Sequence, residues 1–218
     1  MDRRAFFTRG AGEVAQAVTK HAAKKARDNA SRWIRPPFAL DELDFLLACT
    51  RCNDCADACP QNLIFPLSAK LGVKVFNTPA MDLINHGCHL CEGWPCVSAC
   101  EKDALTISDL SDKGSLEKDL SIKEKEGVDL QDSENNQLAT RVLPIIATVT
   151  INTKTCLPYS GPECGACRVC PVEGAMVWDM EKPSINTFLC TGCALCREAC
   201  IVEPKAINVM SKYKVAQA

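Results

Sequence analysis

The stretch that decides the fold is Cys190-Thr-Gly-Cys193-Ala-Leu-Cys196-Arg-Glu-Ala-Cys200, in which four cysteines follow the spacing C-x2-C-x2-C-x3-C. This spacing is typical of proteins that bind iron–sulfur clusters, because its two-residue gaps bring three thiolates to one [4Fe–4S] cluster. The fourth cysteine lies about one helical turn beyond the third, so it faces the other cluster of a pair. Gly192 relieves crowding where the backbone bends around the cluster.

Three further runs use the remaining cysteines of the chain, which has 16 in 218 residues. The first run repeats the spacing of the opening stretch, whereas the second and third depart from it in the lengths of their gaps. The first run consists of Cys49, Cys52, Cys55 and Cys59, the second of Cys88, Cys91, Cys96 and Cys100, and the third of Cys156, Cys164, Cys167 and Cys170.

Crossed ligation, in which the last cysteine of each run serves the other cluster of its pair, divides all sixteen cysteines into four sets of four. Site I takes Cys49, Cys52, Cys55 and Cys100; site II takes Cys88, Cys91, Cys96 and Cys59; site III takes Cys156, Cys164, Cys167 and Cys200; site IV takes Cys190, Cys193, Cys196 and Cys170. We therefore expect four [4Fe–4S] clusters with no open iron position. Such clusters transfer single electrons, so we expect an electron carrier or accessory subunit and not an enzyme.

The gap between Cys167 and Cys170 is the least regular feature of this assignment, since it has two residues where the other runs have three. Loss of one residue rotates the next ligand by about 100° on an α-helix. We expect Cys170 either to reach site IV through a distorted turn or to leave the cluster of site IV labile.

Two other uses of so many cysteines fit the spacing less well. A disulfide framework requires a secreted chain, and C-x2-C pairs cannot bridge to each other without strain. Structural zinc pairs C-x2-C units about 15 to 20 residues apart and does not require a triplet followed by C-x3-C. The spacing therefore favours iron–sulfur clusters over both.

The pattern predicts an α+β protein made of two tandem two-cluster ferredoxin-like modules with a helical N-terminal extension. Short strands are expected before and after the cluster loops, at 104–107, 143–151, 175–178 and 206–209. Residues 108–137 hold nine acidic and four basic residues and no cysteine, which is typical of a linker or insertion. The predicted domains are the extension 1–38, module 1 at 39–107, an acidic linker or insertion at 108–140, and module 2 at 141–218.

The N-terminal extension is basic. Residues 1–35 carry nine Lys or Arg against three Asp or Glu, a net charge of +6. A helix is expected from Glu13 until the residue before Pro36, and a second helix from Leu40 to Leu47 with Asp41 as its N-cap. The first helix is either a solvated terminal helix or a docking segment for an acidic partner or an anionic membrane surface. Its apolar face is mostly alanine, so membrane contact would be weak.

Several classes of protein are excluded by what the sequence lacks. No run of 18 apolar residues is present, so no transmembrane segment is expected. Aromatic residues are sparse and do not alternate with basic ones, so nucleic-acid binding has no support. Arg3-Arg4 resembles a twin-arginine export motif, but charged residues follow where an apolar region would stand. We expect a cytoplasmic protein, with twin-arginine export as the alternative.

These motifs resemble the NapF, NapG and MauM ferredoxin-type proteins, which are associated with periplasmic nitrate reductase and methylamine utilisation. The front of the chain resembles NapF at Arg35-Pro36-Pro37 and Cys49-Thr-Arg-Cys52, and the back resembles NapG and MauM at Cys156-Leu-Pro-Tyr and Cys190-Thr-Gly-Cys193. The resemblance implies electron transfer to or from a larger redox enzyme or a quinone-linked pathway. It also implies an alternative, a cytoplasmic partner that helps to assemble or mature a metal-containing oxidoreductase.

Overall fold

The computed structural model describes residues 3–107 and 143–214, with only the backbone described for residues 3–15. The chain divides into two units, one that joins Met1–Thr106 to Pro144–Ala218 and one that consists of Ile107–Leu143. Only the two ends of the second unit are among the described residues, and the acidic linker predicted at 108–140 lies outside them. The first unit contains all sixteen cysteines.

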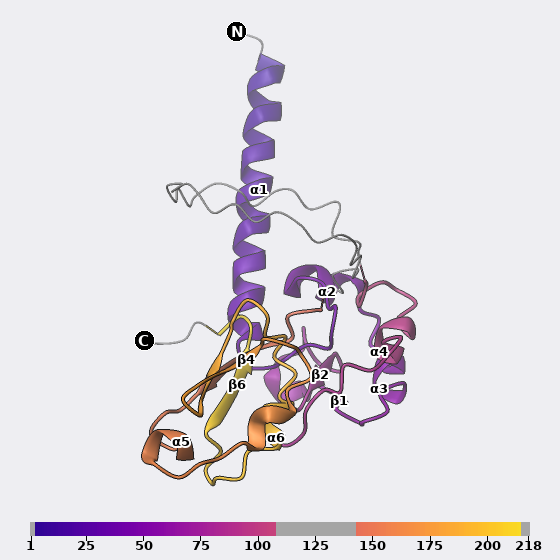
Figure 1. The fold of residues 1–218 in the computed structure, drawn as a ribbon. Coiled ribbons are helices and arrows are strands. Elements are labelled where there is room, and N and C mark those ends of the chain that lie inside the picture. The colour runs from indigo at the N-terminus through magenta and orange to yellow at the C-terminus, as the bar shows by residue number, and fades with distance from the viewer. Residues whose placement is uncertain (1–2, 108–142, 215–218) are drawn as a thin grey trace, which may run out of the picture. The chain divides into compact units, whose positions relative to one another are not determined.

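The N-terminal extension forms one long helix, α1 (Arg3–Ala30), which packs by its C-terminal end against α2 (Glu42–Ala48) (Figure 1). Helix α1 begins ten residues before the predicted start at Glu13, and it ends before Pro36 as predicted. Asp41 stands at the N-cap position of α2 but makes no cap hydrogen bond with its side chain. The predicted N-cap position is therefore confirmed, but the Asp41 carboxylate accepts hydrogen bonds from Arg27 and from the Tyr213 hydroxyl in place of a backbone amide.

Residues 39–107 contain two very short helices, α3 (Asp54–Asp57) and α4 (Pro95–Ser98), which pack against each other. A two-stranded antiparallel sheet of β1 (Ile64–Pro66) and β2 (Pro79–Met81) lies between them in the sequence, with the 3-10 helix η1 (Ala69–Leu71) in its connection. The strand predicted at 104–107 was wrong, because only Leu105 bridges to Ala39. The segment that contains Ala39 continues into α2, which begins three residues later, so it cannot extend the pairing into a strand.

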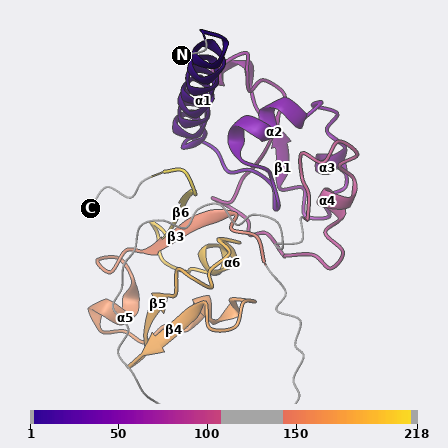
Figure 2. The ribbon, with the colours of Figure 1, turned by 90° about the horizontal axis from the view of Figure 1, so that it is seen from above.

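Residues 143–214 form two antiparallel pairs of strands around further short helices (Figure 2). Strand β3 (Ala147–Ile151) pairs with β6 (Ile207–Ser211), and β4 (Met176–Asp179) pairs with β5 (Lys182–Ile185). The short helices are α5 (Leu157–Ser160), the 3-10 helix η3 (Ala166–Val169) and α6 (Leu195–Glu198). Helix α6 packs against η3 and β6. The strands predicted at 143–151, 175–178 and 206–209 correspond to β3, β4 and β6, and the mixture of helices and small sheets confirms the α+β class.

The C-terminal strand packs against the end of α1. Ala30 and Trp33 belong to a buried apolar cluster, and Tyr213 packs against it. The Ser211 hydroxyl donates a buried hydrogen bond of 2.7 Å to the carbonyl of Ala30. The base of α1 is therefore held by residues from both ends of the cysteine-bearing unit.

Candidate metal centres

The cysteine runs lie in loops that lead directly into the short helices. In three of the four runs, the residue two positions before the third cysteine adopts the left-handed conformation and the helix begins at the next residue. These residues are Asn53 with φ 72°, Trp94 with φ 48° and Ala194 with φ 66°. This shared turn reverses the backbone within the loop. All sixteen cysteines are free thiols.

The third run differs from the other three in its backbone conformation, and it differs around the short gap between Cys167 and Cys170. Gly165 occupies the equivalent position with φ −119°, and the helix that follows, η3, is a 3-10 helix. Cys170 comes directly after η3 in an extended conformation, with φ −57° and ψ 120°. In the other runs one helical alanine separates the helix from the last cysteine. The missing residue is thus accommodated by a tighter helix and an extended exit.

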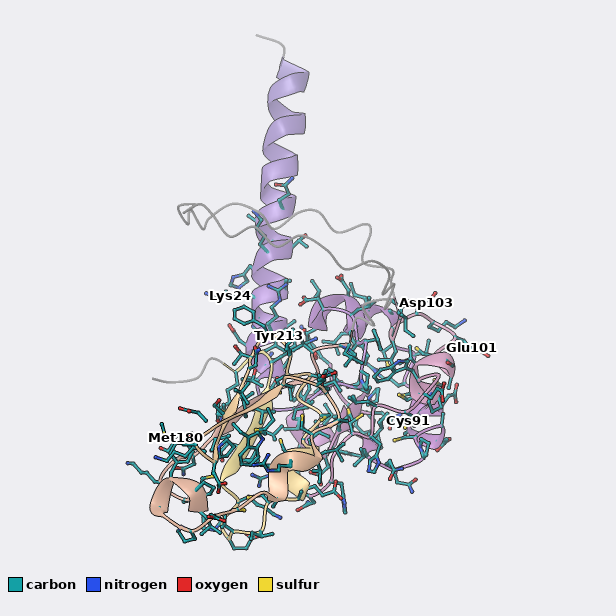
Figure 3. The ribbon with its side chains drawn as sticks, viewed as in Figure 1. Lys24, Cys91, Glu101, Asp103, Met180 and Tyr213 are labelled. Carbon is teal, nitrogen blue, oxygen red and sulfur yellow. The ribbon has the colours of Figure 1, made fainter. Side chains whose placement is uncertain are left out.

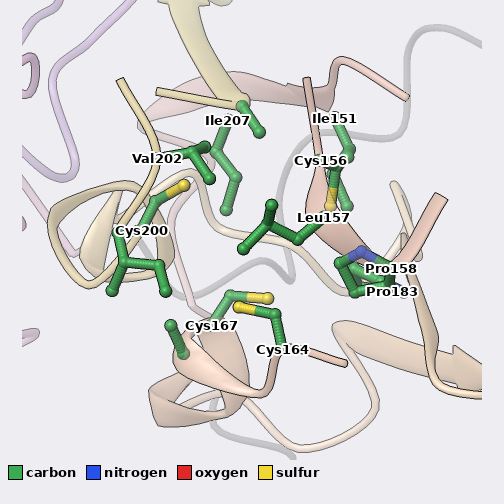
Figure 4. Close-up of a pocket in the computed structure, with 13 residues that line it drawn as sticks. Ile151, Cys156, Leu157, Pro158, Cys164, Cys167, Pro183, Cys200, Val202 and Ile207 are labelled. Atoms are coloured by element: carbon green, nitrogen blue, oxygen red, sulfur yellow. The ribbon is translucent and has the colours of Figure 1, made fainter. Parts of the chain in front are cut away.

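Three of the four predicted sets of cysteines each line one cavity. The cysteines of site I, Cys49, Cys52, Cys55 and Cys100, line a cavity together with Phe45 and Pro79. The cysteines of site III, Cys156, Cys164, Cys167 and Cys200, surround an apolar cavity that also contacts Leu157 (Figure 4). The cysteines of site IV, Cys170, Cys190, Cys193 and Cys196, line a third cavity beside Thr191. Each set combines cysteines from both runs of one half of the chain.

For site II the structure provides electrostatic evidence of proximity. The pKa of the Cys96 thiol is raised to about 11, first by burial and next by the charge of Cys59, with a smaller effect from Cys91. Burial raises the pKa of the Cys88 thiol to about 12, with added effects of Cys96 and Cys91. Cys59 and Cys91 therefore lie close enough to Cys96 to raise the pKa of its thiol.

Burial dominates the chemistry of these thiols. It raises the pKa of Cys55 and of Cys196 to about 12, and that of Cys167 to about 11. The thiolate is the form that binds metal, and a buried thiolate is costly unless a cation compensates its charge. A set of four cysteines that includes buried thiols is therefore a suitable donor set for a metal cluster.

Two buried polar atoms support the same interpretation. The side-chain oxygens Asn53 Oδ1 and Thr191 Oγ1 are buried and have no hydrogen-bond partner. Asn53 lines the cavity of site I, and Thr191 lines the cavity of site IV. Buried polar groups without a partner are uncommon, and their presence at these two cavities indicates a missing partner there. Neither residue stands out in the sequence beyond its place inside a cysteine run.

Within the described residues, no three His, Cys, Asp or Glu side chains are placed to hold a single metal ion. Four thiolates around one tetrahedral zinc lie ~3.8 Å apart, given Zn–S bonds of ~2.3 Å. Four thiolates around the four irons of a cubane lie farther apart than that.

A buried ion pair supports the wall of site I. Arg35 and Glu42 are joined by hydrogen bonds of 2.6 and 3.0 Å, and their side chains are 3% and 0% exposed. Arg35 also donates to the Thr78 hydroxyl and to the carbonyl of Pro79, which lines the cavity. Burial raises the pKa of the Cys49 thiol, and the charge of Arg35 lowers it in part.

Comparison with known proteins identifies relatives over most of the chain. The ferredoxin-type protein NapG of Haemophilus influenzae is 28% identical over 191 residues, which are 81% of this chain and 58% of that protein. The methylamine utilization ferredoxin-type protein MauM of Paracoccus denitrificans is 29% identical over 196 residues, covering 84% of this chain and 73% of that protein. The ferredoxin-type protein NapF of Escherichia coli is 28% identical over 178 residues, covering 79% of this chain and 83% of that protein.

The chain is a homologue of the NapG, NapF and MauM ferredoxin-type proteins. The resemblance predicted from the motifs is confirmed, and the 16 cysteines fit iron–sulfur motifs. The chain spans little more than half the length of the Haemophilus influenzae NapG. No family model and no solved structure matches the chain. Among the described helices, none has both the length and the apolar character needed to cross a membrane.

Proposed function

We propose that the chain is an electron-transfer protein that carries four [4Fe–4S] clusters and passes single electrons to or from a larger redox enzyme or a quinone-linked pathway. The observation that carries this proposal is that three cavities are each lined by four cysteines drawn from both runs of one half, as crossed ligation requires. The similarity to ferredoxin-type proteins of nitrate reduction and methylamine utilisation supports it.

In this proposal each of sites I to IV binds one cluster through the four cysteines that define it. When bound, a [4Fe–4S] cluster accepts and donates one electron at a time. The protein contributes thiolate ligands, burial and hydrogen bonds to sulfur, all of which influence the reduction potential. Because every iron has a thiolate, no position is open to a substrate, and we propose that the chain is a carrier or accessory subunit and not an enzyme.

Iron and sulfide analysis of the protein purified without oxygen tests the number of clusters. Four cubanes require about 16 irons and about 16 sulfides per chain, and a value near eight would exclude one pair of sites. A redox titration of the same sample should show reversible reduction of all clusters. A protein with full iron content that cannot be reduced reversibly would contradict electron transfer while leaving the cluster assignment intact.

The ligand assignment is tested at Cys170, which follows the irregular gap of the third run. Cys170→Ser and Cys193→Ser remove ligands of the same proposed cluster, so each should lower the iron content to about 12 per chain. Thr50→Ser, an exposed change next to Cys49, is the control and should retain about 16. If Cys170→Ser keeps full iron while Cys193→Ser does not, Cys170 is not a ligand.

We propose that the redox partner binds the basic helix α1. Lys20, Lys24 and Lys25 are exposed on this helix, and Lys24 is marked in Figure 3. Exposed positive charge favours association with an acidic protein surface. Weak contact with an anionic membrane surface stays an alternative for the same residues.

The domain arrangement and the cellular location also stay proposals. We propose ferredoxin-like modules at 39–107 and 141–218, joined by a linker or insertion at 108–140 and preceded by the extension 1–38. We further propose that the protein works in the cytoplasm, where thiols stay reduced, because charged residues follow Arg3-Arg4 where a twin-arginine signal has an apolar region. Fractionation of the native cells tests this, and recovery from the periplasm would favour the twin-arginine alternative.

A second candidate function is assembly or maturation of a metal-containing oxidoreductase. The exposed basic residues of α1 favour this function, because they offer a binding site for the immature enzyme. The two functions differ in one measurement. A carrier is reduced reversibly and exchanges electrons with its partner, whereas an assembly protein co-purifies with a cluster-free or cofactor-free enzyme and releases it after maturation.

A further inference from the structure

One of the places where the two halves of the cysteine-bearing unit meet is formed by residues 84–88 and 193–198, which we call the junction. The amide of Cys88 donates a hydrogen bond of 2.7 Å to the carbonyl of Cys193. Both residues are buried. A backbone hydrogen bond therefore links a cysteine of the second run directly to a cysteine of the fourth.

Side chains of α6 reinforce this hydrogen bond. Arg197 Nε donates to the carbonyl of Ile84 at 2.9 Å, and Glu198 Oε2 accepts from the amide of Gly87 at 2.7 Å. The second carboxylate oxygen of Glu198 lies 3.7 Å from Nδ1 of His86. Three closely spaced residues of the first half are thus contacted by two consecutive residues of one helix in the second half.

The junction is also closely packed. Gly87 is buried, and a Cβ atom placed on it would lie 2.6 Å from the backbone nitrogen of Leu195. The obstacle is backbone, which cannot rotate away as a flexible side chain can. Any residue larger than glycine at this position would push the two halves apart.

The two linked cysteines belong to different proposed clusters, Cys88 to site II and Cys193 to site IV. Within the first half, sites I and II share the packed helices α3 and α4, and within the second half sites III and IV share η3 and α6.

We propose that the junction places sites II and IV side by side, so that the four sites form one series in the order I, II, IV, III and the two halves exchange electrons there. This inference rests on the proposed function and deepens it. In one exchange, the reduced cluster of one site loses one electron and the oxidised cluster of the other gains it. No bond forms and no proton moves. The external reductant is a one-electron donor such as dithionite in the experiment below.

The first test compares two glycines in the full protein with all four clusters. Gly87→Ala should separate the halves. Gly165→Ala should not, although Gly165 also adjoins a proposed ligand, because a Cβ atom at this position would contact only the flexible Arg168 side chain. After reduction with dithionite, the electron paramagnetic resonance spectrum of the wild type and of Gly165→Ala should contain a magnetic interaction that Gly87→Ala loses. Hydrogen exchange at the Cys88 amide should become faster in Gly87→Ala alone.

The second test isolates the two sites that the junction joins. Cys52→Ser with Cys164→Ser removes sites I and III, and Cys91→Ser with Cys170→Ser removes sites II and IV; each double variant should keep about eight irons. The remaining clusters should interact magnetically in the first double variant and not in the second. Equal spectra would overturn the proposed order. A wild-type iron content near eight would instead overturn the proposed function, so the two failures are distinct.

If a double variant does not bind its remaining clusters, the comparison of Gly87→Ala with Gly165→Ala still tests the junction in the protein with all sixteen cysteines. Unchanged magnetic interaction in Gly87→Ala, together with faster exchange at the Cys88 amide, would show that the junction opens without affecting the clusters, and would overturn the proposal.

Discussion

Thr191 is a buried hydroxyl whose position suggests a role in setting a reduction potential. It is 3% exposed, it lines the cavity of site IV and its hydroxyl has no partner. Its carbonyl accepts a hydrogen bond of 2.7 Å from the amide of Ile146, which fixes the residue in the loop. Burial raises the pKa of the neighbouring Cys193 thiol, the amide of Leu195 lowers it in part, and the charge of Cys170 raises it further.

We predict that Thr191→Val lowers the reduction potential of one cluster and leaves the others unchanged. A hydroxyl that donates to sulfur stabilises the reduced, more negative state, so its removal favours the oxidised state. The shift is ~60 mV if the hydrogen bond is worth ~1.4 kcal/mol more in the reduced state. The measurement is a redox titration followed by electron paramagnetic resonance.

The first run provides the matched control for this prediction. Thr50 also follows the first cysteine of its run, but it is exposed and lines the cavity of site I, so Thr50→Val should leave the potential of the site IV cluster unchanged. Thr191→Ser keeps the hydroxyl and should restore the wild-type potential. A Thr191→Val protein with full iron content and unchanged potentials would exclude the hydroxyl from any role in tuning.

At the scale of elements, the buried ion pair of Arg35 and Glu42 joins the turn after α1 to α2 and to β2. We predict that Glu42→Ala or Arg35→Ala alone lowers the free energy of unfolding by ~3–5 kcal/mol, because each leaves a buried charge without its partner. The double variant should lose less than the sum of the two. Urea unfolding measures all three.

The exposed ion pair of Arg27 and Asp41 is the control for that measurement. Its side chains are 54% and 31% exposed, so water and salt screen the interaction. Arg27→Ala should lower the free energy of unfolding by less than ~1 kcal/mol. If the two pairs have similar effects, burial does not set the strength of the Arg35 ion pair.

Helix α1 leads to a prediction about truncation. Deleting residues 1–24 removes the exposed Lys20 and Lys24 but keeps Arg27 and Ala30, which contact α2 and β6. We expect this variant to keep its iron content and to bind its redox partner more weakly, with the remaining binding less dependent on salt. Deleting residues 1–32 should also lower stability, because Ala30 belongs to the buried cluster. Unchanged partner affinity after the shorter deletion would exclude docking through α1.

The elements also show which parts of the structure the sequence allowed us to predict. Helices α1 and α2 and strands β3, β4 and β6 have patterns long enough to recognise. Strand β5 was not predicted, because it contains Pro183 and because its hairpin turn, Met180-Glu181, takes positive φ values without Asn or Gly. Strands β1 and β2 are three residues each, too short for an alternating pattern to appear.

The cysteine sites, like the helices and strands, could be predicted only in part. Ligand spacing can be read directly from the chain, so the four sets of cysteines could be predicted from it, and three of these sets each line one cavity. The burial of the Thr191 and Asn53 side chains depends on how the loops fold. The junction depends on contacts more than one hundred residues apart, such as Gly87 with Glu198. Nothing in a single sequence reports a contact of that kind.

At the scale of the whole cysteine-bearing unit, the contacts between its halves lead to a prediction about cooperativity. Ser211 donates a buried hydrogen bond to Ala30, Tyr213 packs on the cluster around Trp33, and Cys88 is bonded to Cys193. The Tyr213 hydroxyl, labelled in Figure 3, also donates to Asp41 at the start of α2. Two halves joined in this way should lose their structure together.

The three tryptophans allow the two halves to be followed separately, since Trp33 and Trp94 lie in the first and Trp178 in the second. We predict that urea unfolding of Trp178→Phe and of the double variant Trp33→Phe with Trp94→Phe gives coincident fluorescence transitions, which is the mark of a single cooperative unit. Ser211→Ala should move both transitions to lower urea by a similar amount, ~1 kcal/mol for one lost hydrogen bond. Two separate transitions, with Ser211→Ala affecting only one of them, would show that the halves fold independently and that their contacts add little stability. That outcome would leave the cluster sites untouched and would weaken the case for a fixed junction between sites II and IV, because electron exchange across it requires the halves to stay in one arrangement.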